Sequence, residues 1–163
     1  GDAEFAPDVF FAMTPNPLVL VGASGWQHPA WRGGFYPEDM PDDWLLSYYN
    51  TQLQAVYLPA AVWQAAAEAT WAQWLHDTRD GFYFVLEAGE ALPVAPASER
   101  VLLATPEWEA AHVWWLDEAP DLRALAQRIM QQATTGEPLF VFSRSGDADL
   151  LERANTLKQV MGY

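Results

Sequence analysis

The sequence predicts an α/β fold in which helices cover a parallel sheet of about six strands. Short apolar runs, rich in β-branched and aromatic residues, alternate along the chain with stretches of helical spacing. This alternation requires right-handed crossovers between parallel strands, which place the helices over the sheet. Strands are expected at residues 18–21, 55–58, 82–87, 101–104, 112–116 and 139–142.

Start and stop signals predict helices between these strands. Pro41 opens the first helix, and Pro59 opens a second that runs to a stop at Gly81. An amphipathic pattern over residues 121–135 predicts a third helix that ends at a glycine. Asp147 is expected to cap the last helix. Each helix therefore has an apolar face to pack on the sheet.

A single domain is expected to account for most of the chain. The length of 163 residues suits one domain with a substantial core. Residues 1–17 are interpreted as an irregular N-terminal arm, because their prolines break both ladders and helices. Residues 88–98 are rich in alanine and proline and are expected to form a loop. The predicted organisation is an arm followed by one α/β domain over residues 18–163.

The charge of the chain disfavours two classes of partner. The formal net charge is −14, with 22 acidic against 8 basic residues. Nucleic-acid binding needs a basic surface that releases counterions, and anionic membranes repel the same negative charge. No apolar run approaches the ~20 residues of a membrane span. We therefore expect neither a nucleic-acid partner nor a membrane.

The chain contains no cysteine and three histidines. Disulfides, thiolate zinc sites and iron–sulfur clusters are thereby excluded, and a reducing cytoplasm is the expected compartment. The histidines His28, His76 and His112 show no paired metal-ligand spacing. No metal and no cofactor are expected. An enzyme is not the favoured class, although the sequence leaves that question open.

Two short motifs resemble a known family. Residues 21–26 read Val-Gly-Ala-Ser-Gly-Trp, and residues 31–37 read Trp-Arg-Gly-Gly-Phe-Tyr-Pro. This pattern resembles the opening of the YecE-like family, domain of unknown function 72, apart from Ala23 where the family has threonine. The resemblance extends over most of the chain from Leu18 onward. It implies an eight-stranded parallel barrel.

Barrels of that type typically need ~250 residues, so the resemblance implies a shortened and divergent member with an incomplete TIM-like barrel. Residues 104–108 and 112–116 resemble the sixth and seventh strands of the family. The expected order therefore runs 101–104, 112–116, 139–142, 18–21, 55–58 and 82–87. An open sheet leaves two unpaired edges, and we expect a homodimer that shields these edges or the bared inner face.

Strand ends carry the functional groups of parallel α/β folds, and here they depart from the family pattern. The departures fall at Tyr57, Pro59, Glu87, Trp115, Asp117, Ser143 and Arg144. The resemblance therefore implies a fold without the family's site. The favoured interpretation is a non-catalytic module that self-associates or binds a partner through aromatic surface.

The alternative is a small enzyme or ligand-binding protein with its site on the loop after the first strand. Arginines there would hold a small anionic ligand, and Glu87 with Asp117 would supply an acid/base pair of the hydrolase type. This interpretation predicts that His28, Arg32 and Arg144 converge on a pocket. Its candidate ligand-binding residues are Ser24, Trp26, His28, Arg32, Tyr36, Glu87, Asp117 and Arg144.

Overall fold

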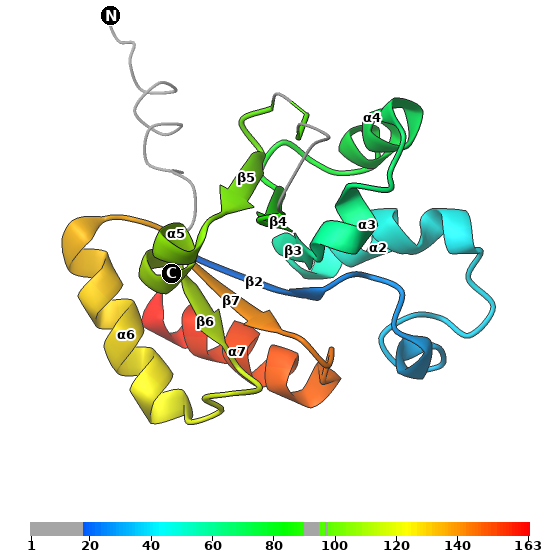
Figure 1. The fold of residues 1–163 in the computed structure, drawn as a ribbon. Helices are drawn as coiled ribbons and strands as arrows, with labels where there is room; N and C mark the ends of the chain where they lie inside the picture. Colours follow the sequence, from blue (N-terminus) through cyan, green and yellow to red (C-terminus); the bar gives the residue numbers. More distant parts are fainter. Residues whose placement is uncertain (1–17, 90–94, 97) are drawn as a thin grey trace, which may run out of the picture.

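A single parallel sheet organises the computed structural model, which describes residues 18–89, 95–96 and 98–163. The arm expected at residues 1–17 lies outside the described residues. Six strands form the sheet in the order β5-β4-β3-β2-β7-β6 (Figure 1). They are β2 (Val19–Ser24), β3 (Ala55–Leu58), β4 (Tyr83–Glu87), β5 (Val101–Ala104), β6 (Val113–Trp115) and β7 (Leu139–Ser143). The α/β prediction is confirmed, and the curled sheet is an incomplete barrel.

Helices follow the capping signals of the sequence. The α-helices are α2 (Leu45–Gln52), α3 (Ala60–Trp63), α4 (Glu68–His76), α5 (Pro106–His112), α6 (Leu122–Thr135) and α7 (Ala148–Met161), with 3-10 turns η1 (Pro29–Trp31) and η2 (Asp42–Trp44). The carboxylates of Asp121 and Asp147 accept backbone N–H bonds at the starts of α6 and α7. Gly136 ends α6 at a φ of 74°, as the glycine stop predicted.

The prediction of one continuous helix between Pro59 and Gly81 is wrong. The chain forms α3, leaves the helical conformation, and starts α4 after Ala67, whose backbone is extended. The apolar residues on both sides of this interruption still face the core, because Trp63 and Trp71 are both buried. A helical pattern of apolar residues therefore predicted the correct face but not the interruption.

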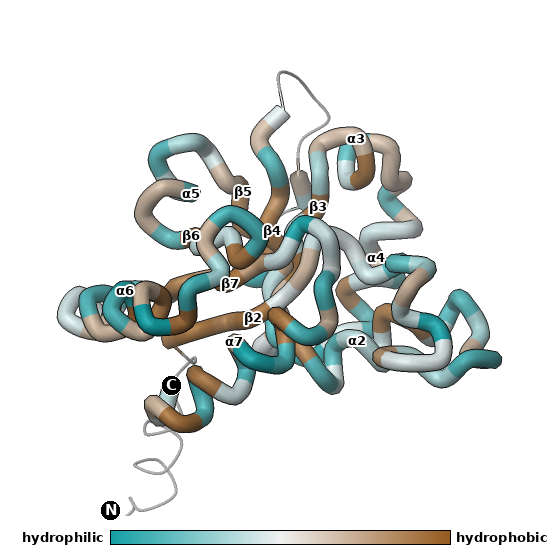
Figure 2. The backbone as a smooth tube through the Cα atoms, turned by 90° about the horizontal axis from the view of Figure 1, so that it is seen from below, coloured by the Kyte–Doolittle hydropathy of each residue, from teal (hydrophilic) through white to brown (hydrophobic). Residues whose placement is uncertain are grey.

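The sheet separates two apolar layers. The outer layer packs beneath α2, α4, α6 and α7, and it includes Val21, Val56, Phe84 and Val141. The inner layer takes the alternate strand residues, which are Leu20, Ala55, Tyr57, Val85, Ala104, Val113, Trp115, Phe140 and Phe142. Figure 2 shows the apolar strands between the outer helices and α5. Because both faces are buried, the strands are apolar throughout, as in other parallel sheets.

The position of β5 corrects the predicted strand order. The sequence predicts residues 101–104 beside 112–116, but β5 pairs with β4, and Ala104 lies opposite Glu87. The chain therefore fills the neighbouring edge of β4 instead of crossing to the far side of the sheet, in keeping with the preference for adjacent connections. The resemblance of residues 104–108 to a strand is also wrong, because Thr105 caps α5 there.

Helix α5 covers the inner face of the open sheet. It connects the two edge strands β5 and β6, which do not pair with each other. Its Trp108 ring packs 5.5 Å from the ring of Phe140, between ring centres. Its Glu109 accepts a hydrogen bond of 3.1 Å from the indole N–H of Trp115. The chain thus buries much of the face that a closed barrel would enclose.

Gly22 and Tyr49 hold β2 against β3. A side chain at Gly22 would meet the Ala55 carbonyl oxygen at 1.8 Å, so only glycine allows this approach. The buried Tyr49 hydroxyl donates to the same oxygen at 2.7 Å and accepts the Ala23 N–H at 2.8 Å. Part of the family-like motif after the first strand is therefore explained by packing.

Lys158 is the sole lysine of the chain and lies buried in α7, with only 8% of the residue exposed. Its ammonium donates to the Gln54 side-chain oxygen at 3.2 Å. Burial, with a smaller contribution from the charge of Arg79, lowers the pKa of Lys158 to about 8.

Within the described part of the chain, helices are too short or too polar to cross a bilayer.

The Tyr49→Phe substitution is expected to destabilise the protein by about 1–3 kcal/mol, because it leaves the buried Ala23 N–H without an acceptor. Urea unfolding followed by tryptophan fluorescence measures the change. Tyr48→Phe is the matched control, since no hydrogen bond of the Tyr48 hydroxyl exists among the described residues. Equal stability of the two variants would contradict the assigned role of Tyr49.

Stability is expected to rise with pH between about 8 and about 10. In that window the unfolded chain keeps a proton on Lys158 that the folded chain has released, because the folded pKa is the lower one. Above this window stability falls, because burial raises the pKa values of Tyr36, Tyr49 and Tyr57 in the folded protein.

Lys158→Met is expected to flatten this rise and to stabilise the protein at pH 7 by roughly 1–3 kcal/mol. Urea midpoints at several pH values measure both effects. A variant that keeps the wild-type slope would exclude Lys158 as its source.

Candidate functional site

The loop after β2 is fixed to the start of α7. Gly25 adopts a φ of 78° and donates its N–H to the Tyr57 carbonyl at 2.9 Å. The Trp31 indole N–H donates to the Gly146 carbonyl at 2.6 Å. His28 contacts the Ser24 carbonyl through Nε2 at 2.8 Å, and its ring lies tilted against that of Trp31, 4.4 Å away between ring centres. The loop is therefore a rigid structure that connects the ends of two neighbouring strands.

Tyr36 and Arg32 stabilise the segment that follows. The buried Tyr36 hydroxyl donates to the Trp26 carbonyl at 2.6 Å. The Arg32 guanidinium pairs with the Asp42 carboxylate and donates to the Met40 carbonyl at 2.7 Å. Both side chains therefore hold the connection between β2 and α2 in place.

Glu87 lies at the end of β4 and caps a helix. Its carboxylate accepts the Ala60 N–H at 2.8 Å, at the start of α3. Its main-chain carbonyl accepts the Trp63 indole N–H at 2.9 Å. Glu87 thus joins the end of β4 to α3, a structural role that the sequence did not indicate.

Asp117 follows β6 and organises the turn between β7 and α7. Its carboxylate accepts bonds from the Ser145 hydroxyl at 2.6 Å, the Ser143 hydroxyl at 3.1 Å, and the backbone N–H groups of Arg144 and Ser145. Partial burial alone would raise the pKa of Asp117, but these hydrogen bonds together hold it below its ordinary value. The carboxylate therefore remains ionised at neutral pH.

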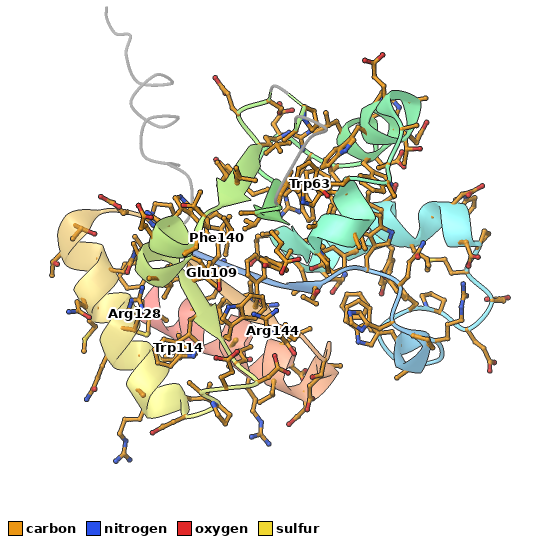
Figure 3. All side chains as sticks on the ribbon, viewed as in Figure 1. Trp63, Glu109, Trp114, Arg128, Phe140 and Arg144 are labelled. Carbon is orange, nitrogen blue, oxygen red and sulfur yellow. The ribbon has the colours of Figure 1, made fainter. Side chains whose placement is uncertain are left out.

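Arg144 closes the inner aromatic cluster at the ends of the strands. Its guanidinium lies 3.7 Å from the centre of the Trp115 ring, and Glu118 pairs with it at 3.7 Å. Tyr57 packs against the same indole, and burial, with smaller contributions from Glu109 and Glu87, raises its pKa to about 12. Glu109 on α5 and Arg144 at the end of β7, both labelled in Figure 3, each contact the Trp115 indole.

The sequence-predicted basic residues do not share one set of partners. His28 contacts Ser24, Arg32 binds the segment 38–42, and Arg144 stacks on Trp115. Glu87 and Asp117 likewise serve separate turns. Within residues 18–89, 95–96 and 98–163, no group of three acidic or histidine side chains is arranged to hold a metal ion.

A groove of about 1030 Å³ opens beside the loop after β2. Its floor includes Trp26 and Trp74, whose ring centres are 5.0 Å apart in an edge-to-face contact. Trp44 lines the groove with 63% of its surface exposed. The polar residues that line it are Ser24, Gln27, His28, Asp42, Asp43, Ser47, Thr70, Gln73 and Asp77.

The groove contains three of the residues predicted from sequence, Ser24, Trp26 and His28, and several that the sequence did not reveal. Trp44 and Trp74 follow helical spacing, which is typical of core positions. Whether such a residue is exposed, as Trp44 is, or half-buried, as Trp74 is, depends on how η2 and α4 pack, and the sequence pattern does not encode that directly. The high tryptophan count, nine in all, was the available signal.

Comparison with known proteins gives a family and one structural likeness. No curated protein matches the chain. A crystal structure of a DUF72 family protein from Thermotoga maritima is 20% identical, with a TM-score of 0.39 over 72% of this chain and 39% of that protein. The chain thus spans about two fifths of that protein's length. The model of the family described as protein of unknown function DUF72 matches residues 20–100, which include both signature motifs, and the chain belongs to this family.

Proposed function

We propose that the chain is a non-catalytic binding module, and that its binding surface is the groove beside the loop after β2. The observation that carries the proposal is the exposed Trp44, which lines the groove together with the contacting rings of Trp26 and Trp74. Large aromatic side chains of this kind are typical anchors of binding surfaces, because they bury much area at low entropic cost. The groove volume lies at the upper end of ligand-binding pockets.

The strand ends support the non-catalytic part of the proposal. A general acid needs a carboxyl group whose pKa is raised toward neutrality. The pKa of Asp117 is lowered instead, and its hydrogen bonds come from its own turn. Glu87 caps α3, and Arg144 stacks on Trp115. These groups account for the structure of the strand ends without any reacting partner.

The charge of the groove argues against the anionic ligand of the alternative interpretation. Asp42, Asp43 and Asp77 line it, and none of the described residues that line it is a lysine or arginine. Arg32, the nearest candidate in sequence, already pairs with Asp42. An anion would therefore meet repulsion without a compensating cation.

Selection from a phage-displayed library of random peptides tests the proposal. We expect enriched peptides to bind the wild-type protein and to lose at least about tenfold in affinity for Trp44→Ala, because hot-spot aromatics typically contribute 2 kcal/mol or more. Because Trp44 is mostly exposed, the variant should fold normally, which circular dichroism checks.

Arg144→Ala is the control for that selection, since Arg144 belongs to the strand-end cluster and not to the groove. It should retain binding. Peptides that depend on Arg144 and not on Trp44 would place the binding surface at the strand ends and overturn the proposal.

Self-association is a second candidate, favoured by the free edge of β5. This strand pairs only with β4 among the described residues, and Leu103 on it is 47% exposed. An unpaired edge with an apolar side chain is a site where a second copy can add. Helix α5 already covers the inner face, so a partner copy would be needed at the edges.

Light scattering at micromolar concentration is expected to give the mass of a dimer, and Leu103→Lys is expected to give a monomer, because a charged residue on an edge strand prevents pairing. The control must carry the same charge at a site away from the core and the sheet edge, so Leu122, which packs on the core, is unsuitable. Val160→Lys, at an exposed site on α7, is the suitable control. A wild-type monomer would exclude the dimer.

A further inference from the structure

We infer that the groove binds a basic peptide segment, an arginine- or lysine-bearing stretch of another protein. The inference rests on the proposed binding function and specifies its partner. Three features of the groove support it: its aromatic rings, its unpaired carboxylate, and a buried donor that lacks an acceptor. Each of them matches one chemical group of such a segment.

The aromatic rings match the cation and its aliphatic stem. Trp44 lines the groove and is 63% exposed, and tryptophan is the best aromatic partner for a guanidinium or ammonium group. Leu58, Pro59 and Val62 line the same groove and provide apolar contact. Arginine and lysine side chains bury their methylene groups along such surfaces while the charged end reaches polar groups.

The carboxylates match the positive charge. Asp43 makes no hydrogen bond or ion pair with any described residue, so its charge is uncompensated in the folded chain. Asp77 accepts a bond from Gln73 at 2.8 Å and has no cationic partner in the described part of the molecule. Carboxylates that pair with a guanidinium form charge-assisted hydrogen bonds, which are stronger than neutral ones.

The buried donor matches a peptide carbonyl. Trp26 lines the groove with only 7% of its surface exposed, yet its indole N–H has no acceptor among the described residues. The indole N–H groups of Trp31, Trp63, Trp114 and Trp115 are bonded, whereas that of Trp71, equally buried but outside the groove lining, also has no acceptor among the described residues. Buried polar groups are normally paired, and Trp26, unlike Trp71, lies where a bound ligand can supply the acceptor. A peptide backbone supplies one, whereas a polyamine or a metal ion does not.

The charge of the whole molecule supports the same partner. A formal charge of −14 attracts cationic segments over several ångströms and increases the rate of encounter at low salt. The groove then selects by contact. Long-range attraction and local chemistry thus favour one class of ligand.

Fluorescence anisotropy with labelled decapeptides tests the inference. The probes are alternating alanine–arginine, alanine–glutamine and alanine–glutamate peptides, and the neutral sugar cellohexaose serves as a competitor. We expect the arginine peptide to bind best and to lose affinity as NaCl rises from about 0.05 to about 0.5 M, because salt screens exposed charges.

Charge-removing variants locate the interaction. Asp43→Asn and Asp77→Asn are each expected to lower the affinity for the arginine peptide about 3- to 10-fold. Trp44→Ala is expected to lower it by about tenfold or more. Glu152→Gln, an equal loss of charge at an exposed site on α7, is expected to leave the affinity unchanged. A loss for Glu152→Gln equal to that of Asp43→Asn would reduce the effect to net charge and overturn the inference.

The remaining outcomes separate the inference from the proposed function. One such outcome is that the glutamine or glutamate peptide binds, or that cellohexaose competes, and that this binding is lost in Trp44→Ala. The groove would then remain the binding surface, but the inference of a basic partner would be overturned. If Trp44→Ala does not change the affinity for the arginine peptide, the assignment of the groove as the binding surface would be overturned.

Discussion

The need to bury the inner face of an open parallel sheet determines the rest of this structure. A closed barrel fills its interior with side chains from all its strands, whereas an open sheet exposes one apolar face. Here the inner face carries Tyr57, Trp115, Phe140 and Phe142, which are too large and apolar to remain in water. Helix α5 joins the two edge strands and covers this face with Trp108. The fold is therefore stabilised within one chain by a helix that lies where a barrel interior would be.

This arrangement explains the chemistry of the strand ends. The large rings of Tyr57 and Trp115 occupy the region that polar groups would use in a catalytic barrel, and Arg144 stacks on the indole. Glu109 joins the cluster because α5 brings it there. The polar groups that remain, Asp117 above all, are satisfied by local turns. The strand ends are thus assembled to support the fold.

The sequence predicted those features of the fold that depend on local chemistry. Alternation of apolar runs predicted the strands, an amphipathic pattern with a glycine stop predicted α6, and the Asp147 cap predicted α7. The position of β5 could not be predicted in this way, because strand order depends on where a loop leads the chain. The start of α5 after its cap at Thr105 was missed because a strand-like family pattern was preferred to the helix-start signal of a threonine cap followed by proline.

The candidate site was predictable only in part, for the same reason. Glu87, Asp117 and Arg144 were recognised as strand-end residues, but their roles depend on Ala60, Ser145 and Trp115, which are distant in sequence. Trp44 was missed because only packing distinguishes an exposed tryptophan from a core one. Asp77 was missed because its place in the groove depends on how α4 packs. Burial of the donor at Trp26 without an acceptor is likewise a property of the fold alone.

These constraints favour the proposed binding surface, which lies outside the sheet. The inner face is covered by α5, so an external ligand must approach elsewhere. The loop after β2 is the best-supported alternative, because the bonds from Trp31 to Gly146 and from Tyr36 to Trp26 make it rigid. A rigid loop holds its aromatic and carboxylate groups in place before a ligand arrives, which lowers the entropic cost of binding. The family motif thus has a physical role that does not require catalysis: it builds one wall of the groove.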